Sequence, residues 1–129
     1  MKITADALIV AAGRGERAGL DILKQFYEKD GKPVLFYTIE AFRKCGIIEN
    51  IVAVLPDDGF ERYADYMRKF TYGMNVVYIS GGSSRMMSVY KGLTALEKLN
   101  VNGIVCIHDG VRPFVTERII TDSVECAKL

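Results

Sequence analysis

The segment AAGRGERAG, at residues 11–19, combines three glycines with two arginines. A glycine loop can present several backbone N–H groups to phosphate oxygens, and nearby cations neutralise the phosphate charge. Both kinds of group occur here, in the residues Gly13, Arg14, Gly15, Arg17, Gly19 and Lys24. The alternative is an ordinary glycine turn with solvated cations, because short glycine motifs also occur by chance.

The glycine spacing departs from two well-known nucleotide motifs. Gly13, Gly15 and Gly19 are spaced G-x-G-x-x-x-G, one residue longer than the dinucleotide fingerprint, and no G-K-[ST] follows as in a Walker loop. No acidic residue precedes Asp57 near the end of the next apolar run, where a dinucleotide site would need one. These departures disfavour a dinucleotide-dependent oxidoreductase and favour a long loop around a phosphate chain.

A second candidate segment is SGGSSRMMSVYKGL, which begins at Ser80. Arg85 and Ser88 lie three residues apart, so they share a face near the start of a helix that Ser83 or Ser84 can cap. A guanidinium, a hydroxyl and free N–H groups would converge there. The alternative is an ordinary capped helix with an exposed arginine.

Acidic residues follow two other apolar runs. Asp109, in HDGVRPF, is a candidate Mg²⁺ ligand, since magnesium bound with phosphates takes only one or two protein carboxylates. The alternative is a turn aspartate that bonds its own backbone. His108 is the only histidine and is interpreted as a structural partner. Asp57 and Asp58 are expected to end a strand and cap the following helix, without a chemical role.

Short apolar runs alternate with helical patterns, which predicts an α/β fold with a mostly parallel sheet and helices on both faces. The expected strands are 5–12, 50–56, 75–80 and 103–109. Helical spacing predicts three helices within 35–42, 60–70 and 86–96 and a fourth after Thr116. The apolar positions of these helices, Met86, Tyr90 and Leu93 among them, are expected to pack on the sheet.

The loops described above all follow predicted strands, and ligands of open α/β sheets bind at the carboxyl ends of the strands. The loops together supply N–H groups, cations, a hydroxyl and a carboxylate, which suits a nucleoside triphosphate with Mg²⁺. No catalytic serine or cysteine set with histidine accompanies them. Transfer of a phosphorus group needs mainly positioning and charge neutralisation, so it fits this inventory.

Composition narrows the class of protein. The 129 residues are 50% hydrophobic and 26% charged, which predicts one globular domain. The net charge of +1 predicts no general affinity for nucleic acid. The 3 cysteines form no C-x-x-C pair, and no apolar run approaches membrane-spanning length. We therefore expect a cytoplasmic protein without a disulfide framework or a membrane partner.

Four motifs occur in order: AAGRGER with KQF, GKPVLFYTIEAF, GGSSRMMSVYKGL and HDGVRPF. Together they resemble the 2-C-methyl-D-erythritol 4-phosphate cytidylyltransferase family, from about Ala5 to Val115. The resemblance implies a Rossmann-like nucleotidyltransferase fold of three α/β/α layers. It also implies an enzyme of the methylerythritol phosphate pathway to isoprenoids, in which the phosphate of the sugar alcohol attacks the α-phosphorus of CTP and pyrophosphate leaves.

The resemblance also implies roles for individual residues. Arg17 and Lys24 match catalytic positions that meet the charge developing at the α-phosphorus, and Asp109 matches the Mg²⁺-binding aspartate. Arg85 and Arg112 would support the loops of the nucleotide site. The first loop, with Gly13, Arg14 and Gly15, would wrap the triphosphate, and the cytosine and ribose pocket would be lined by Ala11, Ala12, Gly81, Gly82, Ser88 and Gly110.

The sequence departs from the family pattern at several points. Leu23 replaces a common proline and Ala18 a common methionine. The family's HDAARP is HDGVRP here, and a valine at the position of Val111 also occurs in the sister family that makes CDP-ribitol from ribitol 5-phosphate. The pattern around Ser88 favours methylerythritol phosphate. Family members also continue with further strands that bind the acceptor and form a homodimer arm. We therefore expect residues 1–129 to be a truncated nucleotidyltransferase domain, and a non-catalytic nucleotide-binding module stays open as the alternative.

Overall fold

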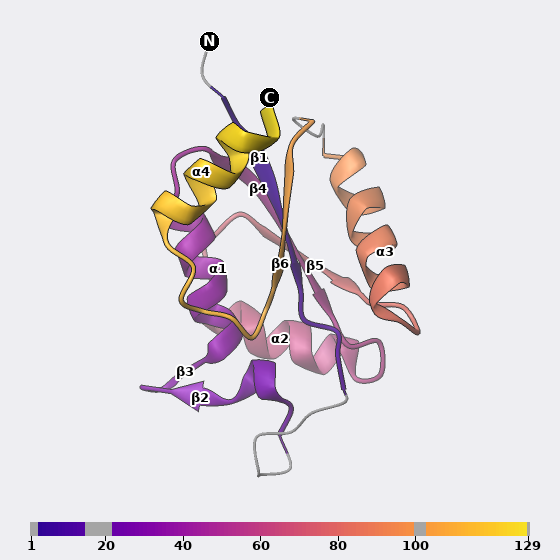
Figure 1. Cartoon of the computed structure of the whole chain (residues 1–129). Helices are drawn as coiled ribbons and strands as arrows, with labels where there is room; N and C mark the ends of the chain where they lie inside the picture. The colour runs from indigo at the N-terminus through magenta and orange to yellow at the C-terminus, as the bar shows by residue number, and fades with distance from the viewer. Residues whose placement is uncertain (1–2, 15–21, 100–102, 129) are drawn as a thin grey trace.

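A computed structural model describes residues 3–14, 22–99 and 103–128. Four parallel strands form a sheet in the order β5-β4-β1-β6 (Figure 1). The strands are β1 (Ala5–Val10), β4 (Ile48–Leu55), β5 (Val76–Ser80) and β6 (Val105–Asp109). The helices are α1 (Val34–Lys44), α2 (Phe60–Phe70), α3 (Arg85–Glu97) and α4 (Glu117–Lys128). The predicted strands, helices and parallel sheet are thus confirmed, with bounds that differ by a few residues.

A short antiparallel hairpin follows the first loop and was not predicted. It consists of β2 (Glu28–Lys29) and β3 (Lys32–Pro33), and a 3-10 turn, η1 (Lys24–Phe26), precedes it. Asp30 and Gly31, between the two strands, have φ of 55° and 80°. Left-handed conformations at both central residues are typical of a two-residue hairpin turn, so the Asp-Gly pair was the signal for it.

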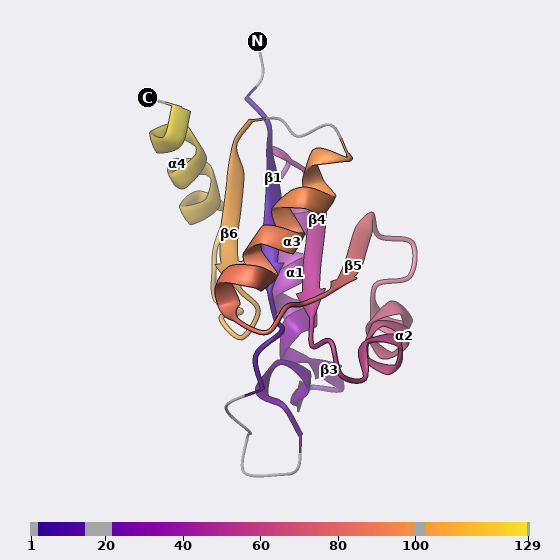
Figure 2. The same cartoon turned by 90° about the vertical axis from the view of Figure 1, so that its right-hand side faces the viewer.

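The helices cover both faces of the sheet, as Figure 2 shows with α3 in front of the strands and α1 behind them. On the face of α1, α2 and α4, the core includes Ile9, Leu35 and Phe42. On the α3 face, it is a smaller cluster, of Leu8, Val52, Val54 and Leu96. The strands read as nearly continuous apolar runs because both of their faces are covered.

The prediction that Met86, Tyr90 and Leu93 pack on the sheet was wrong. Met86 is 80% and Tyr90 63% exposed, and Leu93 is also exposed. The buried residues of α3 are Ser88, Gly92 and Leu96. A Cβ at Gly92 would lie only 2.2 Å from Leu8 Cδ1, so the helix approaches β1 closely on its small-residue face.

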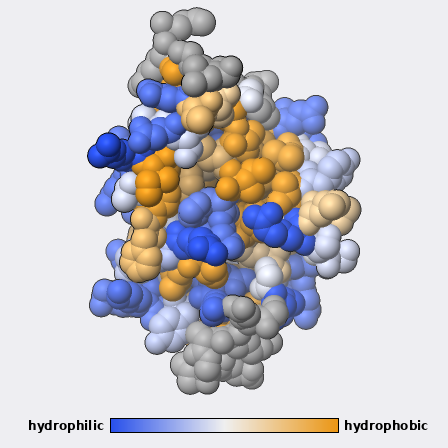
Figure 3. Space-filling view, viewed as in Figure 1, coloured by the Kyte–Doolittle hydropathy of each residue, from blue (hydrophilic) through white to orange (hydrophobic). Residues whose placement is uncertain are grey.

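The outer side of β6 carries hydrophobic surface. Ile107 of β6 is 45% exposed and Ile119 of α4 54% exposed, and Figure 3 shows hydrophobic side chains over β6 and beside α4.

No helix in the described part of the chain is long and apolar enough to cross a membrane. Cys45, Cys106 and Cys126 are free thiols, as expected.

Candidate functional site

A cavity of about 780 Å³ lies at the carboxyl ends of the strands. Its wall comes from the ends of β1 and β6, the turns after β1, β4 and β5, and the first turns of α3. The lining residues are Val10, Ala12, Gly13, Arg14, Asp57, Asp58, Gly81, Gly82, Ser83, Ser84, Arg85, Ser88, Lys91 and Asp109. Three turns and the end of β6, which are far apart in the sequence, therefore meet at one site, as parallel strand order predicts.

The floor of this cavity continues the hydrogen bonding of the sheet by one residue. The N–H groups of Ala11, Gly81 and Gly110 each donate to a backbone carbonyl at the end of a neighbouring strand, at 2.8 Å in all three cases. The acceptors are, in the same order, Val54, Leu55 and Val10. The turns are therefore fixed by backbone pairing where they leave the strands.

Small residues in these turns fit a crowded edge. A Cβ added at Gly81 would lie 2.6 Å from Ala12 Cβ and 2.8 Å from Ser88 Oγ. A Cβ added at Gly110 would lie 2.8 Å from Ala11 Cβ. Real Cβ contacts are not this short, so the glycines are required by the approach of neighbouring turns.

Gln25 holds the base of the first loop and was not predicted to have a role. Its side chain is 4% exposed, and Nε2 donates to the carbonyl O of Ala11 at 2.7 Å and to that of Gly13 at 2.9 Å. Both N–H hydrogens of the amide are thereby used on one short segment. This role could not be predicted from the sequence, because only the structure shows that Gln25 is buried, and a buried amide needs partners.

The second wall is the turn from β5 into α3. Ser84 caps the helix by accepting from the N–H of Met87 at 3.2 Å, as predicted for Ser83 or Ser84. Ser88 Oγ accepts from the N–H of Gly82 at 3.1 Å, and Lys91 Nζ donates to the carbonyl O of Gly81 at 3.1 Å. Lys91 was missed because helical spacing alone does not show how far a lysine reaches.

Aspartates line the cavity from the end of β6 and from the turn after β4. Asp109 ends β6, and its Oδ2 lies 3.8 Å from Arg112 Nε. The prediction that Asp57 and Asp58 cap α2 was wrong, because the N-cap is Gly59, with φ of 85° and no side-chain hydrogen bond. The two aspartates line the cavity instead.

Each of these two aspartates has a partner that ties one turn to another. Asp57 accepts a hydrogen bond from the hydroxyl of Ser80. Asp58 binds Arg14 through its backbone carbonyl and through its carboxylate, at 3.8 Å between Arg14 Nη2 and Asp58 Oδ2. The turn after β4 therefore connects the first loop to the end of β5.

His108 has the structural role that its isolation in the sequence indicated. Its Nε2 donates to the carbonyl O of Arg112 at 3.0 Å, and its ring lies 5.4 Å from that of Phe42. His108, which does not line the cavity, therefore holds the turn after β6 in place.

The structure brings most of the predicted site residues together. Eight line the cavity: Ala12, Gly13, Arg14, Gly81, Gly82, Arg85, Ser88 and Asp109. Ala11 and Gly110 are buried directly behind them. Lys24 lies exposed on η1 and does not line the cavity, while Gly15 and Arg17 lie outside the described residues.

Comparison with known proteins identifies the family. Residues 5–129 match the family model of 2-C-methyl-D-erythritol 4-phosphate cytidylyltransferase (IspD). The chain belongs to this family. The enzyme of this name from Clostridium kluyveri is 41% identical over 124 residues, which are 95% of this chain and 52% of that protein.

Solved structures support the IspD assignment and the Rossmann-like nucleotidyltransferase fold. The 4-diphosphocytidyl-2C-methyl-D-erythritol synthase of Anaerococcus prevotii superimposes with a TM-score of 0.76 at 29% identity, over 98% of this chain and 51% of that one. The bifunctional IspDF of Campylobacter jejuni gives a TM-score of 0.75 at 25% identity, over 96% and 30%. The chain thus spans about half the length of the IspD relatives it matches.

Proposed function

We propose that this chain forms the nucleotide-binding part of a cytidylyltransferase that transfers CMP from CTP to 2-C-methyl-D-erythritol 4-phosphate and releases pyrophosphate. The observation that carries the proposal is the convergence of eight predicted nucleotide-site residues on one cavity, in a chain of the IspD family. A non-catalytic nucleotide-binding module is the alternative that the same cavity allows. We further propose that residues 1–129 belong to one nucleotidyltransferase domain, and that the protein is cytoplasmic and forms a homodimer.

Each wall of the cavity has a task in this proposal. The turn at Gly13 and Arg14 binds the triphosphate through N–H groups and positive charge. The Gly81–Gly82 turn, held by Ser88, presents backbone groups to the base and ribose. Arg17 and Lys24 act on the α-phosphate, as proposed from the family resemblance, where they neutralise charge in the transition state.

Mg²⁺ is the proposed cofactor. Among the described residues, no three His, Cys, Asp or Glu side chains form a metal-binding group. A lone carboxylate suits magnesium that is shared with substrate phosphates, and the Asp109 side chain, 45% exposed at the cavity, offers one. When bound there, the ion would supply positive charge that neutralises the phosphates of the substrate.

Titration calorimetry with CTP, ATP and NADH in the presence of Mg²⁺ tests the nucleotide site. We expect saturable binding of CTP that weakens by about tenfold, roughly 1.4 kcal/mol, in Asp109→Asn or Lys24→Ala and on removal of Mg²⁺ by a chelator. Asp122→Asn is the matched control, because Asp122 lies exposed on α4 and pairs with Arg118. A folded chain that binds no CTP, or binds ATP equally, would contradict the proposal.

Pyrophosphate release, measured with each acceptor, then distinguishes the two candidate transfer reactions. We expect release with CTP and 2-C-methyl-D-erythritol 4-phosphate, and less release with ribitol 5-phosphate. Faster release with ribitol 5-phosphate would move the protein to the sister activity that Val111 allows. CTP binding without release for either acceptor would favour the non-catalytic module.

A further inference from the structure

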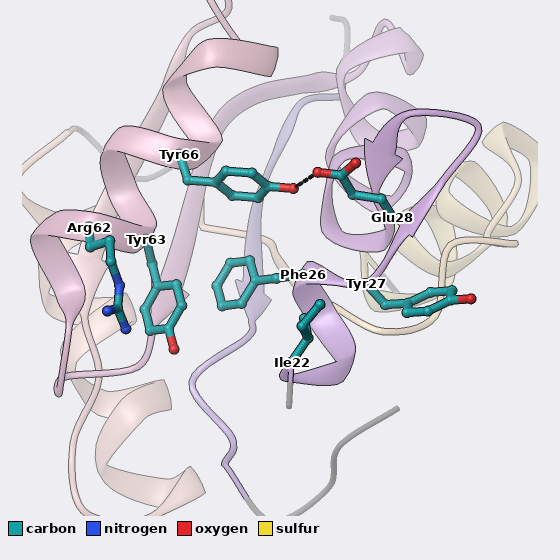
Figure 4. Close-up of a pocket in the computed structure, with 7 residues that line it drawn as sticks. All are labelled: Ile22, Phe26, Tyr27, Glu28, Arg62, Tyr63 and Tyr66. Atoms are coloured by element: carbon teal, nitrogen blue, oxygen red, sulfur yellow. Dashed lines mark hydrogen bonds between the residues drawn. The ribbon is translucent and has the colours of Figure 1, made fainter. Parts of the chain in front are cut away.

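A second cavity, of about 600 Å³, lies between α2 and the segment from η1 to β2 (Figure 4). Its walls are mostly aromatic, with one cation and one carboxylate: Ile22, Phe26, Tyr27, Glu28, Arg62, Tyr63 and Tyr66. It shares no lining residue with the nucleotide cavity. One of its residues, however, contacts both described ends of the first loop.

That residue is Tyr63 of α2. Its ring stacks on Phe26 of η1, with centroids 4.3 Å apart and planes at 4°. The Arg14 guanidinium also lies over the Tyr63 ring, 5.9 Å from its centroid. Arg14 precedes residues 15–21 and Phe26 follows them, so the same ring contacts the chain on both sides of that segment.

The other groups around the ring fix its place. Arg62 lies 5.1 Å from the centroid, and Figure 4 shows it beside Tyr63 on the side away from Phe26. The Phe26 ring meets Tyr66 edge to face at 6.2 Å and 81°, and the Tyr66 hydroxyl donates to Glu28. Burial and the hydrogen bond to Glu28 raise the pKa of Tyr66 above its ordinary value. A phenol already holds its proton at neutral pH, so Tyr66 is the donor in this bond.

Backbone and side-chain contacts connect this ring to the nucleotide site. Gln25, next to Phe26, binds the carbonyls of Ala11 and Gly13. Arg14, next to Gly13, also binds Asp58 just before α2. A change in the position of Tyr63 would therefore move Arg14 directly, and would move Lys24 and Gln25 through Phe26.

We propose that Tyr63 is a positioning residue that holds Arg14 and η1 in the relative positions that nucleotide binding needs. This inference rests on the proposed function of the first loop, because Arg14 is assigned there to the triphosphate. Tyr63 itself does not line the nucleotide cavity, so it acts through Arg14 and Phe26. The ring carries this role, because stacking and cation–π contacts need its face.

CTP affinity in Tyr63 variants is the first test. Tyr63→Leu is expected to weaken binding about fivefold, the order of effect for losing a ring stack and a cation–π contact. Tyr63→Phe keeps the ring and is expected to retain the affinity. Tyr72→Leu is the matched control, since Tyr72 lies 93% exposed just beyond α2.

A double variant distinguishes positioning from general destabilisation. If Tyr63 acts through Arg14, then Arg14→Ala and Tyr63→Leu together weaken binding by less than the product of their separate effects. Multiplicative effects, or full affinity in a folded Tyr63→Leu chain, would overturn the proposal. If Tyr63→Leu does not fold, Tyr63→Met, whose flexible side chain fills similar space without a ring, replaces it.

Hydrogen exchange of the ligand-free chain keeps this test independent of CTP. Tyr63→Leu is expected to speed amide exchange in residues 11–14 and 24–27, and Tyr63→Phe to leave it unchanged. If the chain binds no CTP but exchange accelerates at both ends, the proposed function fails and the structural link stands. Unchanged exchange at both ends would overturn the role of Tyr63.

Discussion

Gly13 and Gly81 both lie in the wall of the nucleotide cavity, but their surroundings differ. A Cβ added at Gly81 would meet Ala12, Ser88 and the carbonyl O of Leu55, all within 3.1 Å. A Cβ added at Gly13 would meet no atom of the described chain within 4 Å. Neither glycine has a left-handed φ, so conformational freedom does not explain them.

The difference shows that the two turns contain glycine for different reasons, although both line the same cavity. Gly81 is needed by the protein itself, since Ala12, Ser88 of α3 and the last carbonyl of β4 leave no room for a side chain at the sheet edge. Gly13 lies beside space that none of the described residues fills and that a ligand can use, and its carbonyl accepts a hydrogen bond from Gln25. Glycine spacing in the sequence is the same kind of signal in both cases, and only packing distinguishes them.

Alanine at each glycine tests this contrast and has the largest expected effect. Gly81→Ala is expected to lower the free energy of unfolding by about 2–3 kcal/mol, because Ala12, Ser88 and the Leu55 backbone must move. Gly13→Ala is expected to change it by less than about 0.5 kcal/mol. Urea unfolding of both variants measures this, and equal losses would remove the distinction.

Gln25→Leu tests how the first turn is held. The buried carbonyl of Ala11 and the part-buried contact to the carbonyl of Gly13 lose their donor, so we expect a loss of about 2 kcal/mol in unfolding free energy. Gln25→Glu, which keeps the shape but loses the amide N–H donors, is expected to lose at least as much. A wild-type midpoint in urea for both would show that the turn does not depend on Gln25.

Ser88→Ala tests the polar contact of the second turn and has the smallest expected effect. The N–H of Gly82 loses its acceptor, so we expect a loss of about 1 kcal/mol, with weaker CTP binding. Thr116→Ala removes only the hydrogen bond from the Ile119 N–H at the start of α4, away from the cavity, and is the matched comparison, at about 1 kcal/mol. Identical CTP affinities in the two variants would contradict a separate role for Ser88.

The Asp-Gly hairpin and the exposed face of α3 show where sequence patterns were insufficient. The Asp30-Gly31 pair is a local turn signal from which the hairpin could have been predicted. The exposure of Met86 and Tyr90 could not be predicted from a local pattern, because α3 has two candidate faces and packs through Ser88 and Gly92. The face with the small residues packs on the sheet because it allows α3 to approach Leu8 closely.

The amino-acid sequence by itself determined the order of strands and helices and the loops that would meet, because apolar periodicity is local and parallel strands share a carboxyl edge. Together with the family resemblance, it also predicted eight residues that line the cavity. Only the tertiary structure decided that Asp57, Asp58 and Lys91 join them and that Tyr63 contacts both ends of the first loop. Those contacts depend on distances between segments that lie far apart in the chain, which no local pattern encodes.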